Sequence, residues 1–299
     1  MRDCPIETLQ PAELTLAGPK RNIAICASPT LLATAVLTNE NTFDVSTDSL
    51  ILNMLYSLKK ACGDAPGFED SQFSVLLTET AGMFPKEKYD LIVRLDELQV
   101  KNSYYGVQYA YMEWEAFVQV HYVAKWSVRD LSGNILDNHT DRDLFSCSSG
   151  VHAARSEAIL HLPGVNDAWW DMGIAVAENY AERLVPQWQT GTRKVYMINK
   201  FADLSQQAYV AMQNNRYAMA FDIWEEMLMT YPKNGKNKAK SRITHNMAVA
   251  CEFENSLDEA LRWIQSSVNR SSNTANNAYL RLLKERKAQV FLLDQQLDQ

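Results

Sequence analysis

The chain has 299 residues, of which 46% are hydrophobic and 22% charged, and its formal net charge is -7. This composition is typical of a folded globular protein and excludes the fibrous and disordered classes. The charge is divided unevenly, because residues 1–192 carry 14 Lys and Arg against 25 Asp and Glu, whereas residues 193–299 carry 15 against 11. Length and charge together predict two domains that meet near Thr192.

No segment reaches the roughly 20 apolar residues that a membrane-spanning helix needs. The sequence opens Met1-Arg2-Asp3-Cys4-Pro5 without an apolar leader region. Cys4 so near the start suggests the remnant of a lipidated cysteine, but the small and apolar residues that should precede such a site are missing. The five cysteines are scattered and include no C-x-x-C pair, which predicts buried free thiols rather than disulfides or a zinc site.

Residues 1–192 show the signals of an α+β domain, a mixed sheet with two helices. Thr47-Asp48-Ser49 offers N-cap oxygens to a first helix that ends at Gly63. A strand precedes this helix and another strand follows it. Such a crossover predicts at least one parallel pair of strands. Short apolar or alternating runs predict strands at residues 21–26, 73–77 and 89–100.

A long hairpin is the strongest strand signal. Residues 116–128 alternate aromatic and β-branched side chains, turn at Ser132-Gly133-Asn134, and return along residues 135–145. A second helix is predicted from Asp167 to Val185, and Pro186 ends it. The strand order of the sheet does not follow from these signals.

The segment 201–234 is predicted to form two amphipathic helices. Asn214-Asn215 supplies a turn, because Asn tolerates a left-handed backbone, and Pro232 stops the second helix. A second copy occupies about residues 241–272, and a capping helix follows from about Thr274 to Leu297. Small residues are placed where paired helices must approach closely, at Ala208 and Ala220 in the first copy and at Ala248 and Ala260 in the second.

These positions resemble the tetratricopeptide repeat, since Ala208, Ala220, Trp224 and Pro232 match the small, small, aromatic and proline positions of its 34-residue pattern. The second copy has Ser272 in place of the terminal proline. The resemblance implies a concave groove lined by the first helix of each pair, which binds a short peptide or a neighbouring subunit, or packs against the N-terminal domain. The groove residues that it implies are Ser205, Tyr209, Met212, Gln213, Arg242, His245, Glu252 and Phe253.

Over nearly its whole length the chain resembles a family of uncharacterised envelope proteins of Bacteroidetes, on the strength of the extended start at residues 8–14, the α/β region and the two tail repeats. That family is usually made with lipoprotein leaders. The resemblance therefore implies a location in the cell envelope, facing the periplasm, and membrane association only through a lost lipid anchor.

Candidate catalytic groups lack a recognisable setting. The run from His139 to Asp143 lacks the Gly and Glu of a calcium loop, and His121 lies within an alternating strand. The hydrolase, nucleotide and zincin signatures are absent, so we expect neither catalysis nor a metal or cofactor. The basic run from Lys233 to Arg242 is interpreted as a solvated connection, and the acidic pI argues against nucleic acid.

Aromatic residues gather between the predicted strands, around Gly106. Tyr104, Tyr105, Tyr109 and Trp114 suit an exposed binding loop, although packing at the core or a sheet edge is the favoured reading of the pattern. We therefore predict a non-catalytic scaffold that binds a protein or peptide partner. The alternative is a hydrolase or carbohydrate-binding activity in the N-terminal domain, which predicts a deep polar pocket near His121 or the tyrosines.

Overall fold

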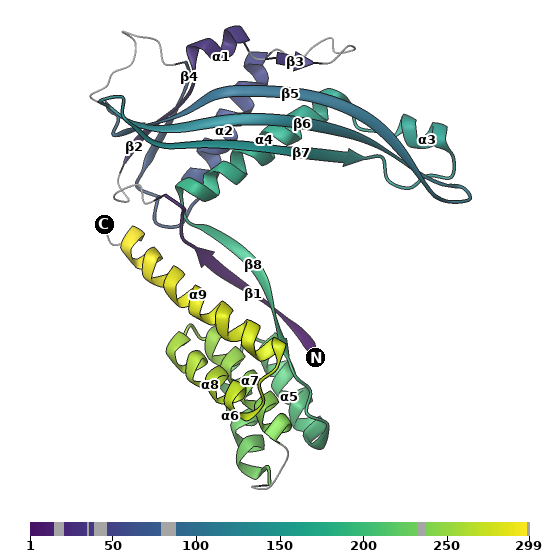
Figure 1. Ribbon diagram of the computed structural model, residues 1–299, viewed down its shortest axis with the longest axis vertical. Coiled ribbons are helices and arrows are strands. Elements are labelled where there is room, and N and C mark those ends of the chain that lie inside the picture. Colours follow the sequence, from purple (N-terminus) through teal and green to yellow (C-terminus); the bar gives the residue numbers. More distant parts are fainter. Residues whose placement is uncertain (15–20, 35, 39–46, 79–87, 233–236, 298–299) are drawn as a thin grey trace. The chain divides into compact units, whose positions relative to one another are not determined.

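The computed structural model describes residues 1–14, 21–34, 36–38, 47–78, 88–232 and 237–297 (Figure 1). The described chain divides into two compact units. The helical unit comprises Met1–Pro11 and Gln187–Gln295, and the sheet unit comprises Ala12–Pro186 and Gln296–Gln299. None of the described helices is both long enough and apolar enough to cross a membrane.

The sheet unit is built on a mixed six-stranded sheet, as predicted. Its main path has the order β4-β2-β5-β6-β7, and β3 also pairs with β5. The pairs β2–β4, β2–β5 and β3–β5 are parallel, whereas β5–β6 and β6–β7 are antiparallel. The strands are β2 (Asn22–Ala27), β3 (Val36–Thr38), β4 (Gln72–Thr78), β5 (Leu91–Ala110), β6 (Glu113–Asp130) and β7 (Ile135–Ser148).

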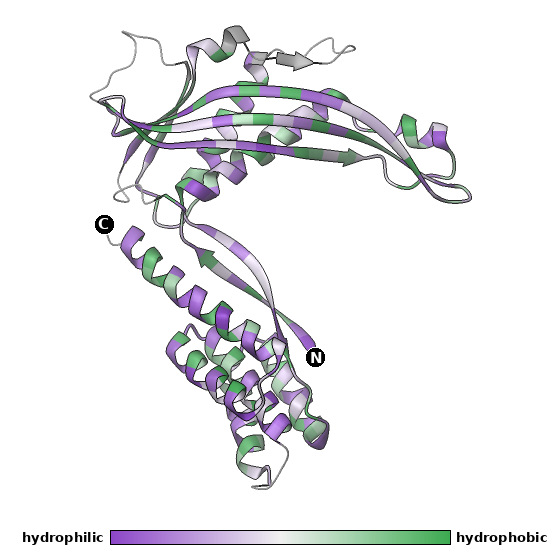
Figure 2. Cartoon of the chain, viewed as in Figure 1, coloured by the Kyte–Doolittle hydropathy of each residue, from purple (hydrophilic) through white to green (hydrophobic). Residues whose placement is uncertain are grey.

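Alternation along β5 and β6 decides which face of the sheet is covered (Figure 2). Every second side chain of β6 from Val118 to Val128 is buried in one apolar core. The opposite face carries paired charges, such as Arg94 with Asp96 and Lys125 with Glu97. The sheet is therefore half-buried, the usual state of antiparallel strands with one covered face.

Two helices cover the apolar face, which confirms the predicted pair: α2 (Thr47–Gly63) and α4 (Val165–Leu184). They approach closely at Gly173, where an added Cβ would lie 3.1 Å from a Leu50 methyl group and 3.2 Å from Met54 Cγ. Asn53 Nδ2 also donates to the Trp170 carbonyl at 3.0 Å. Two short helices, α1 (Pro29–Thr34) and α3 (Arg155–Leu160), complete the unit.

The helical unit contains two consecutive helix pairs and a long final helix. Asn215 and Asn255, which follow the first helix of each pair, have φ values of 57° and 58°. The predicted left-handed turn is therefore present, and it recurs at the same 40-residue offset as Ala220 and Ala260. The helices are α5 (Ala202–Gln213), α6 (Tyr217–Thr230), α7 (Asn237–Phe253), α8 (Leu257–Arg270) and α9 (Thr274–Leu297), preceded by a short 3-10 turn at Asn199–Phe201.

The four alanines predicted at the helix contacts are all fully buried. Trp224 and Ile264, at equivalent places in α6 and α8, are also buried in the same apolar core. A methyl group at each contact lets the helix axes approach, while the larger side chain fills the space beside it. The predicted packing of this segment is confirmed.

A two-stranded ribbon in the helical unit was not predicted. It pairs β1 (Arg2–Gln10) antiparallel with β8 (Gln187–Val195), so that Ile6 lies opposite Gly191. Sequence analysis predicts one domain from residue 1 to residue 192. In the structure the boundary lies after Pro186 instead, and Met1–Pro11 belongs to the helical unit. The pairing joins segments about 180 residues apart, which no local pattern reveals.

Candidate functional site

Helix α5 contributes the first half of the predicted groove, and the chain itself covers most of it. Ser205 is buried, and its Oγ accepts a hydrogen bond from the Ile198 N–H at 3.0 Å. Tyr209 donates to the Asp3 carbonyl at 3.3 Å, and the Arg2 guanidinium lies over its ring at 4.8 Å. Met212 is buried, while Gln213 is exposed and donates to the Tyr209 hydroxyl.

Helix α7 contributes the second half, and it hydrogen-bonds β8. His245 is 4% exposed, and its ring lies 3.1 Å from the Lys194 carbonyl and 3.0 Å from Asn276 Oδ1. Burial lowers the pKa of His245, whereas these two hydrogen bonds act to raise it. The Arg242 guanidinium stacks over the Tyr196 ring at 5.3 Å.

The remaining α7 positions lie at the end of the helix. Glu252 accepts two hydrogen bonds from Arg193, at 2.7 and 2.8 Å. Phe253 packs edge-on against Tyr217 with their ring centroids 5.1 Å apart. The positions that the repeat resemblance assigned to an open groove are therefore mostly occupied by contacts with the chain's own ribbon and neighbouring helices. A partner could reach Tyr209, His245 and Glu252 only by displacing their contacts with the ribbon.

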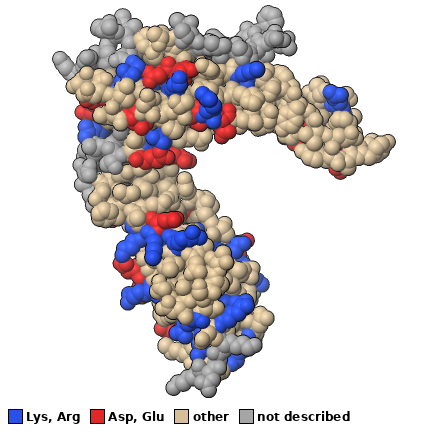
Figure 3. Space-filling model, in the orientation of Figure 1, with Lys and Arg blue, Asp and Glu red and all other residues tan. Residues whose placement is uncertain are grey.

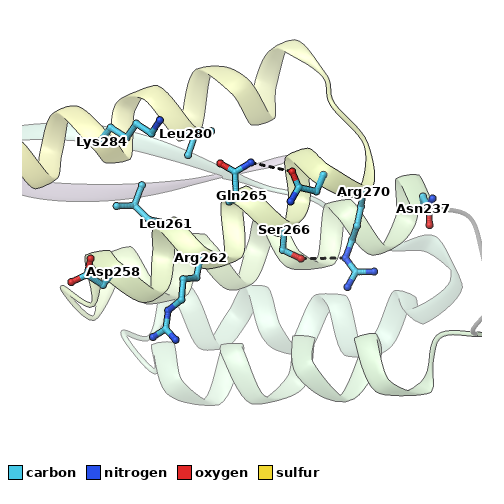
Figure 4. A pocket seen from close by; sticks show the side chains of 10 residues that line it. Asn237, Asp258, Leu261, Arg262, Gln265, Ser266, Arg270, Leu280 and Lys284 are labelled. Atoms are coloured by element: carbon cyan, nitrogen blue, oxygen red, sulfur yellow. Dashed lines mark hydrogen bonds between the residues drawn. The ribbon is translucent and has the colours of Figure 1, made fainter.

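A hollow that was not predicted lies on the helical unit between α8 and α9, beside the start of α7 (Figure 4). Its volume is about 780 Å³. Leu261 of α8 and Leu280 of α9 point into the space between the two helices and are half-buried. Gln265, Ser266 and Asn269 supply polar groups beside them. We refer to this feature as the α8–α9 groove.

Cations dominate the rim of the α8–α9 groove. Arg262 pairs with Glu259, and Asp258 pairs with Lys287. Arg270 donates through Nε to Ser266 at 3.3 Å, and neither it nor Lys284 pairs with a carboxylate in the part of the chain that the structure describes. Figure 3 shows several Lys and Arg side chains on the face of the helical unit in view. The groove thus combines apolar side chains with positive charge.

The aromatic cluster is part of the β5–β6 hairpin rather than a loop between strands. Tyr104, Tyr105 and Tyr109 lie on β5, and Trp114 lies on β6, because the two strands continue almost to the turn at Met112. The three tyrosines are between 42% and 57% exposed. Tyr105 stacks on Phe117 across the strands at 4.7 Å, and Tyr109 donates to Glu115 at 2.7 Å. The cluster is an exposed aromatic strand surface.

A hollow of about 610 Å³ lies on β5–β7 near His121, where the alternative function predicted a deep pocket. Gln99, Lys101, His121 and Arg142 line it, and all four are exposed. His121 Nε2 lies 3.3 Å from Ser103 Oγ, and among the described residues no carboxylate hydrogen-bonds the other ring nitrogen. The hollow lies on the polar face of the sheet and is open to solvent, as the α8–α9 groove also is.

The remaining candidate residues of the sequence analysis lie on a strand edge, in buried or half-buried positions or at the start of a helix. His139 and Asp141 lie on β7, at the end of the sheet path, as expected for a solvated edge. All five cysteines are free, and burial raises the pKa of Cys4 and of Cys251 to about 11. Of the basic run, Lys233 and Lys236 lie outside the described residues, and the rest begins α7. Within the described ranges no group of three potential metal ligands occurs.

Two family models match the chain, and both are described as domains of unknown function. One, DUF8603, covers residues 78–196, and the other, DUF6340, covers residues 206–287. No curated protein matches the sequence. A solved structure described as a neuraminyllactose-binding hemagglutinin homologue from Helicobacter pylori is 12% identical, covers 56% of this chain and 94% of its own, and has a TM-score of 0.34. A similarity at that level supports no conclusion about this chain.

Proposed function

We propose that this protein is a non-catalytic interaction protein whose helical unit binds a segment of a protein partner in the α8–α9 groove. The observation that carries the proposal is the groove itself, about 780 Å³ with Leu261 and Leu280 inside and cations around it. Apolar side chains surrounded by a polar rim are typical of protein interfaces. In this proposal the docking surface is the α8–α9 groove. It is not the concave groove implied by the repeat resemblance, where the ribbon makes contacts of its own.

The charges indicate what kind of segment would fit. Arg270 and Lys284 have no carboxylate partner among the described residues, and residues 193–299 carry a net positive charge. A partner with acidic residues flanking one or two apolar side chains would complement both features. Electrostatic complementarity of this kind favours fast association and correct register more than affinity.

The shape of the groove follows from how the last three helices pack. Helices α7 and α8 lie close along their lengths, whereas α8 and α9 approach each other in fewer places. A final helix without a partner of its own exposes the surface that a further helix would cover in a longer repeat array. The tetratricopeptide resemblance and the envelope location that the wider resemblance implies are parts of the same proposal.

A photocrosslinking amino acid at Gln265, inside the groove, tests this function in the producing organism. We expect a crosslinked adduct with one protein, and none from the same amino acid at Asp222, which is exposed on α6. The double substitution Arg270→Glu and Lys284→Glu should remove the adduct. As a matched control, Lys101→Glu with Arg155→Glu reverses two exposed charges of the sheet unit and should leave the adduct intact.

Equal crosslinking from Gln265 and Asp222 would contradict the proposal. So would an adduct that survives the groove charge reversal but disappears in the sheet-unit control. Circular dichroism of each purified variant shows whether the helices are intact, because the four substituted side chains are exposed or half-buried and should tolerate the change.

A further inference from the structure

The helical unit buries two arginines beside a single carboxylate, away from the α8–α9 groove. Arg193 of β8 hydrogen-bonds both oxygens of Glu252, and Arg286 Nε of α9 lies 3.6 Å from one of them. The side chain of Glu252 is 0% exposed, and those of Arg193 and Arg286 are 11% and 13% exposed. Tyr279 also donates to Glu252 at 2.6 Å.

The cluster has an excess positive charge. Burial and the adjacent Glu252 hold the pKa of Tyr279 far above its usual value, so the phenol is neutral. His245, whose ring lies 5.0 Å from that of Tyr279, has a pKa lowered by burial and brings no carboxylate to the cluster. Two guanidinium groups therefore share one carboxylate. Burying an unpaired charge is costly, which makes this imbalance unusual for a merely structural cluster.

Arg286 is the member without adequate partners. Its Nε and Nη1 atoms are buried, and neither has a hydrogen-bond partner among the described residues. Burial lowers the pKa of Arg286, and the charge of Arg193 lowers it further, whereas Glu252 partly opposes both. Glu252 already accepts from Arg193 at both oxygens and from Tyr279 at Oε2, and its Oε1 lies 3.6 Å from Arg286 Nε, beyond a normal hydrogen bond.

Arg193 and Arg286 line a polar hollow of about 230 Å³ between the ribbon and α9. Thr8, Thr190, Gln189 and Gln289 bring hydroxyl and amide groups to it. Gly191 leaves room for the Arg193 guanidinium, since an added Cβ would come within 3.3 Å of Arg193 Nη1. One carboxylate, Glu285, also lines the hollow, but it is exposed and therefore screened by solvent.

We propose that this hollow is a binding site for a small oxyanion, a phosphate or a carboxylate, held by the guanidinium of Arg286. A guanidinium presents several N–H donors in a planar fork that matches the oxygens of both anions. The anion would accept from the part of the Arg286 guanidinium that faces the hollow and would neutralise the excess charge of the cluster. Thr190 offers a hydroxyl donor from β8, so that the bound anion would also hold β8 against α9.

The test uses the full chain, sodium phosphate and sodium acetate, at constant ionic strength set with chloride. We expect phosphate or acetate to raise the thermal unfolding temperature saturably, and calorimetric titration to give one site per chain. Arg286→Gln should weaken binding at least about tenfold. Arg281→Gln makes the same change of charge at an exposed position of the same helix and should bind like the unsubstituted protein.

Comparing the two anions shows which class of ligand the site takes. A phosphate site binds phosphate more tightly than acetate, and a carboxylate site binds acetate more tightly. In chloride alone, Arg286→Gln should be at least as stable as the unsubstituted protein, since it removes the buried charge that exceeds the single carboxylate of the cluster. Should that variant fail to fold, Arg286→Lys keeps the charge but loses the planar fork, and should still bind more weakly.

Neither anion stabilising or binding the unsubstituted protein would overturn the proposal and indicate a hollow filled by water. Equal binding by the unsubstituted protein and the Arg286 variants would also overturn it, because the anion would then bind elsewhere.

Discussion

The two units bury different kinds of side chain. The core of the sheet unit is almost entirely apolar, whereas nine of the twelve buried polar residues among those described belong to the helical unit. Some of these residues hold β8 and the residue after it, as His245 and Asn246 show by hydrogen-bonding the backbone of Lys194 and Tyr196. Others join helices, as Ser241 and Ser267 do between α7 and α8. Apolar packing gives the sheet unit its stability, and hydrogen bonds give the ribbon its position.

The largest effect should follow removal of the buried carboxylate. Glu252→Gln leaves Arg193 and Arg286 without their counter-charge, and should lower the free energy of unfolding by about 3–5 kcal/mol. Urea denaturation followed by circular dichroism measures this change. Glu254→Gln, an exposed neighbour on the same turn, should change the stability little. Equal effects of the two substitutions would show that the buried network contributes nothing special.

A slightly smaller effect is expected in the apolar core of the sheet unit. Leu55 of α2 is fully buried there, so Leu55→Ala should cost about 2–5 kcal/mol by leaving a cavity. The matched control is Leu160→Ala in α3, where the side chain is 80% exposed. Leu55 lies in the sheet unit, whereas the proposed anion site lies in the helical unit. Phosphate or acetate should therefore not restore the stability that the Leu55 variant loses.

Loss of one ribbon anchor should have a moderate effect. Asn246 accepts from the Tyr196 N–H at 2.7 Å and donates to its carbonyl at 2.8 Å. Asn246→Ala leaves both backbone groups without this partner and should cost about 1–3 kcal/mol. Hydrogen exchange should become faster in β8 but not in β5 or β6. Asn269→Ala, on the exposed side of α8, should leave exchange in β8 unchanged.

The smallest effect concerns pH. Burial lowers the pKa of His245, so the unfolded chain binds a proton at higher pH than the folded chain does. Stability should therefore be complete above the unfolded value of about 6.5 and decline as the pH falls below it. His245→Gln should reduce the difference in unfolding free energy between pH 7.5 and pH 5.5. His121→Gln, at an exposed position, should not.

Periodicity was sufficient to predict the helices and strands that pack locally. Ala208, Ala220, Ala248 and Ala260 repeat at helical spacing, and each contact lies within one pair of neighbouring helices. The ribbon escaped prediction because β1 pairs with a strand about 180 residues away and carries Pro5, which weakens a strand signal. Burial does alternate along β1, as in a strand with one covered face, but the sequence of β1 alone does not show that β8 is its partner.

The candidate sites depend on such distant contacts. Glu252 was placed on the inner face of α7, but nothing local indicated that Arg193 and Arg286 would meet it there. The α8–α9 groove depends on how far the last helix diverges from its neighbour, and helical spacing does not determine that divergence.

Thiol labelling is the most direct test of the central claim that the ribbon covers the inner face of the helices. Cys4 lies on β1 and is 3% exposed because it packs against the helical core. After brief treatment of the native chain with N-ethylmaleimide, peptide mass spectrometry should show Cys4 as protected as the fully buried Cys62 and slower than the half-buried Cys147. Modification of Cys4 at the rate found in urea-unfolded chain would show that the ribbon does not cover this face.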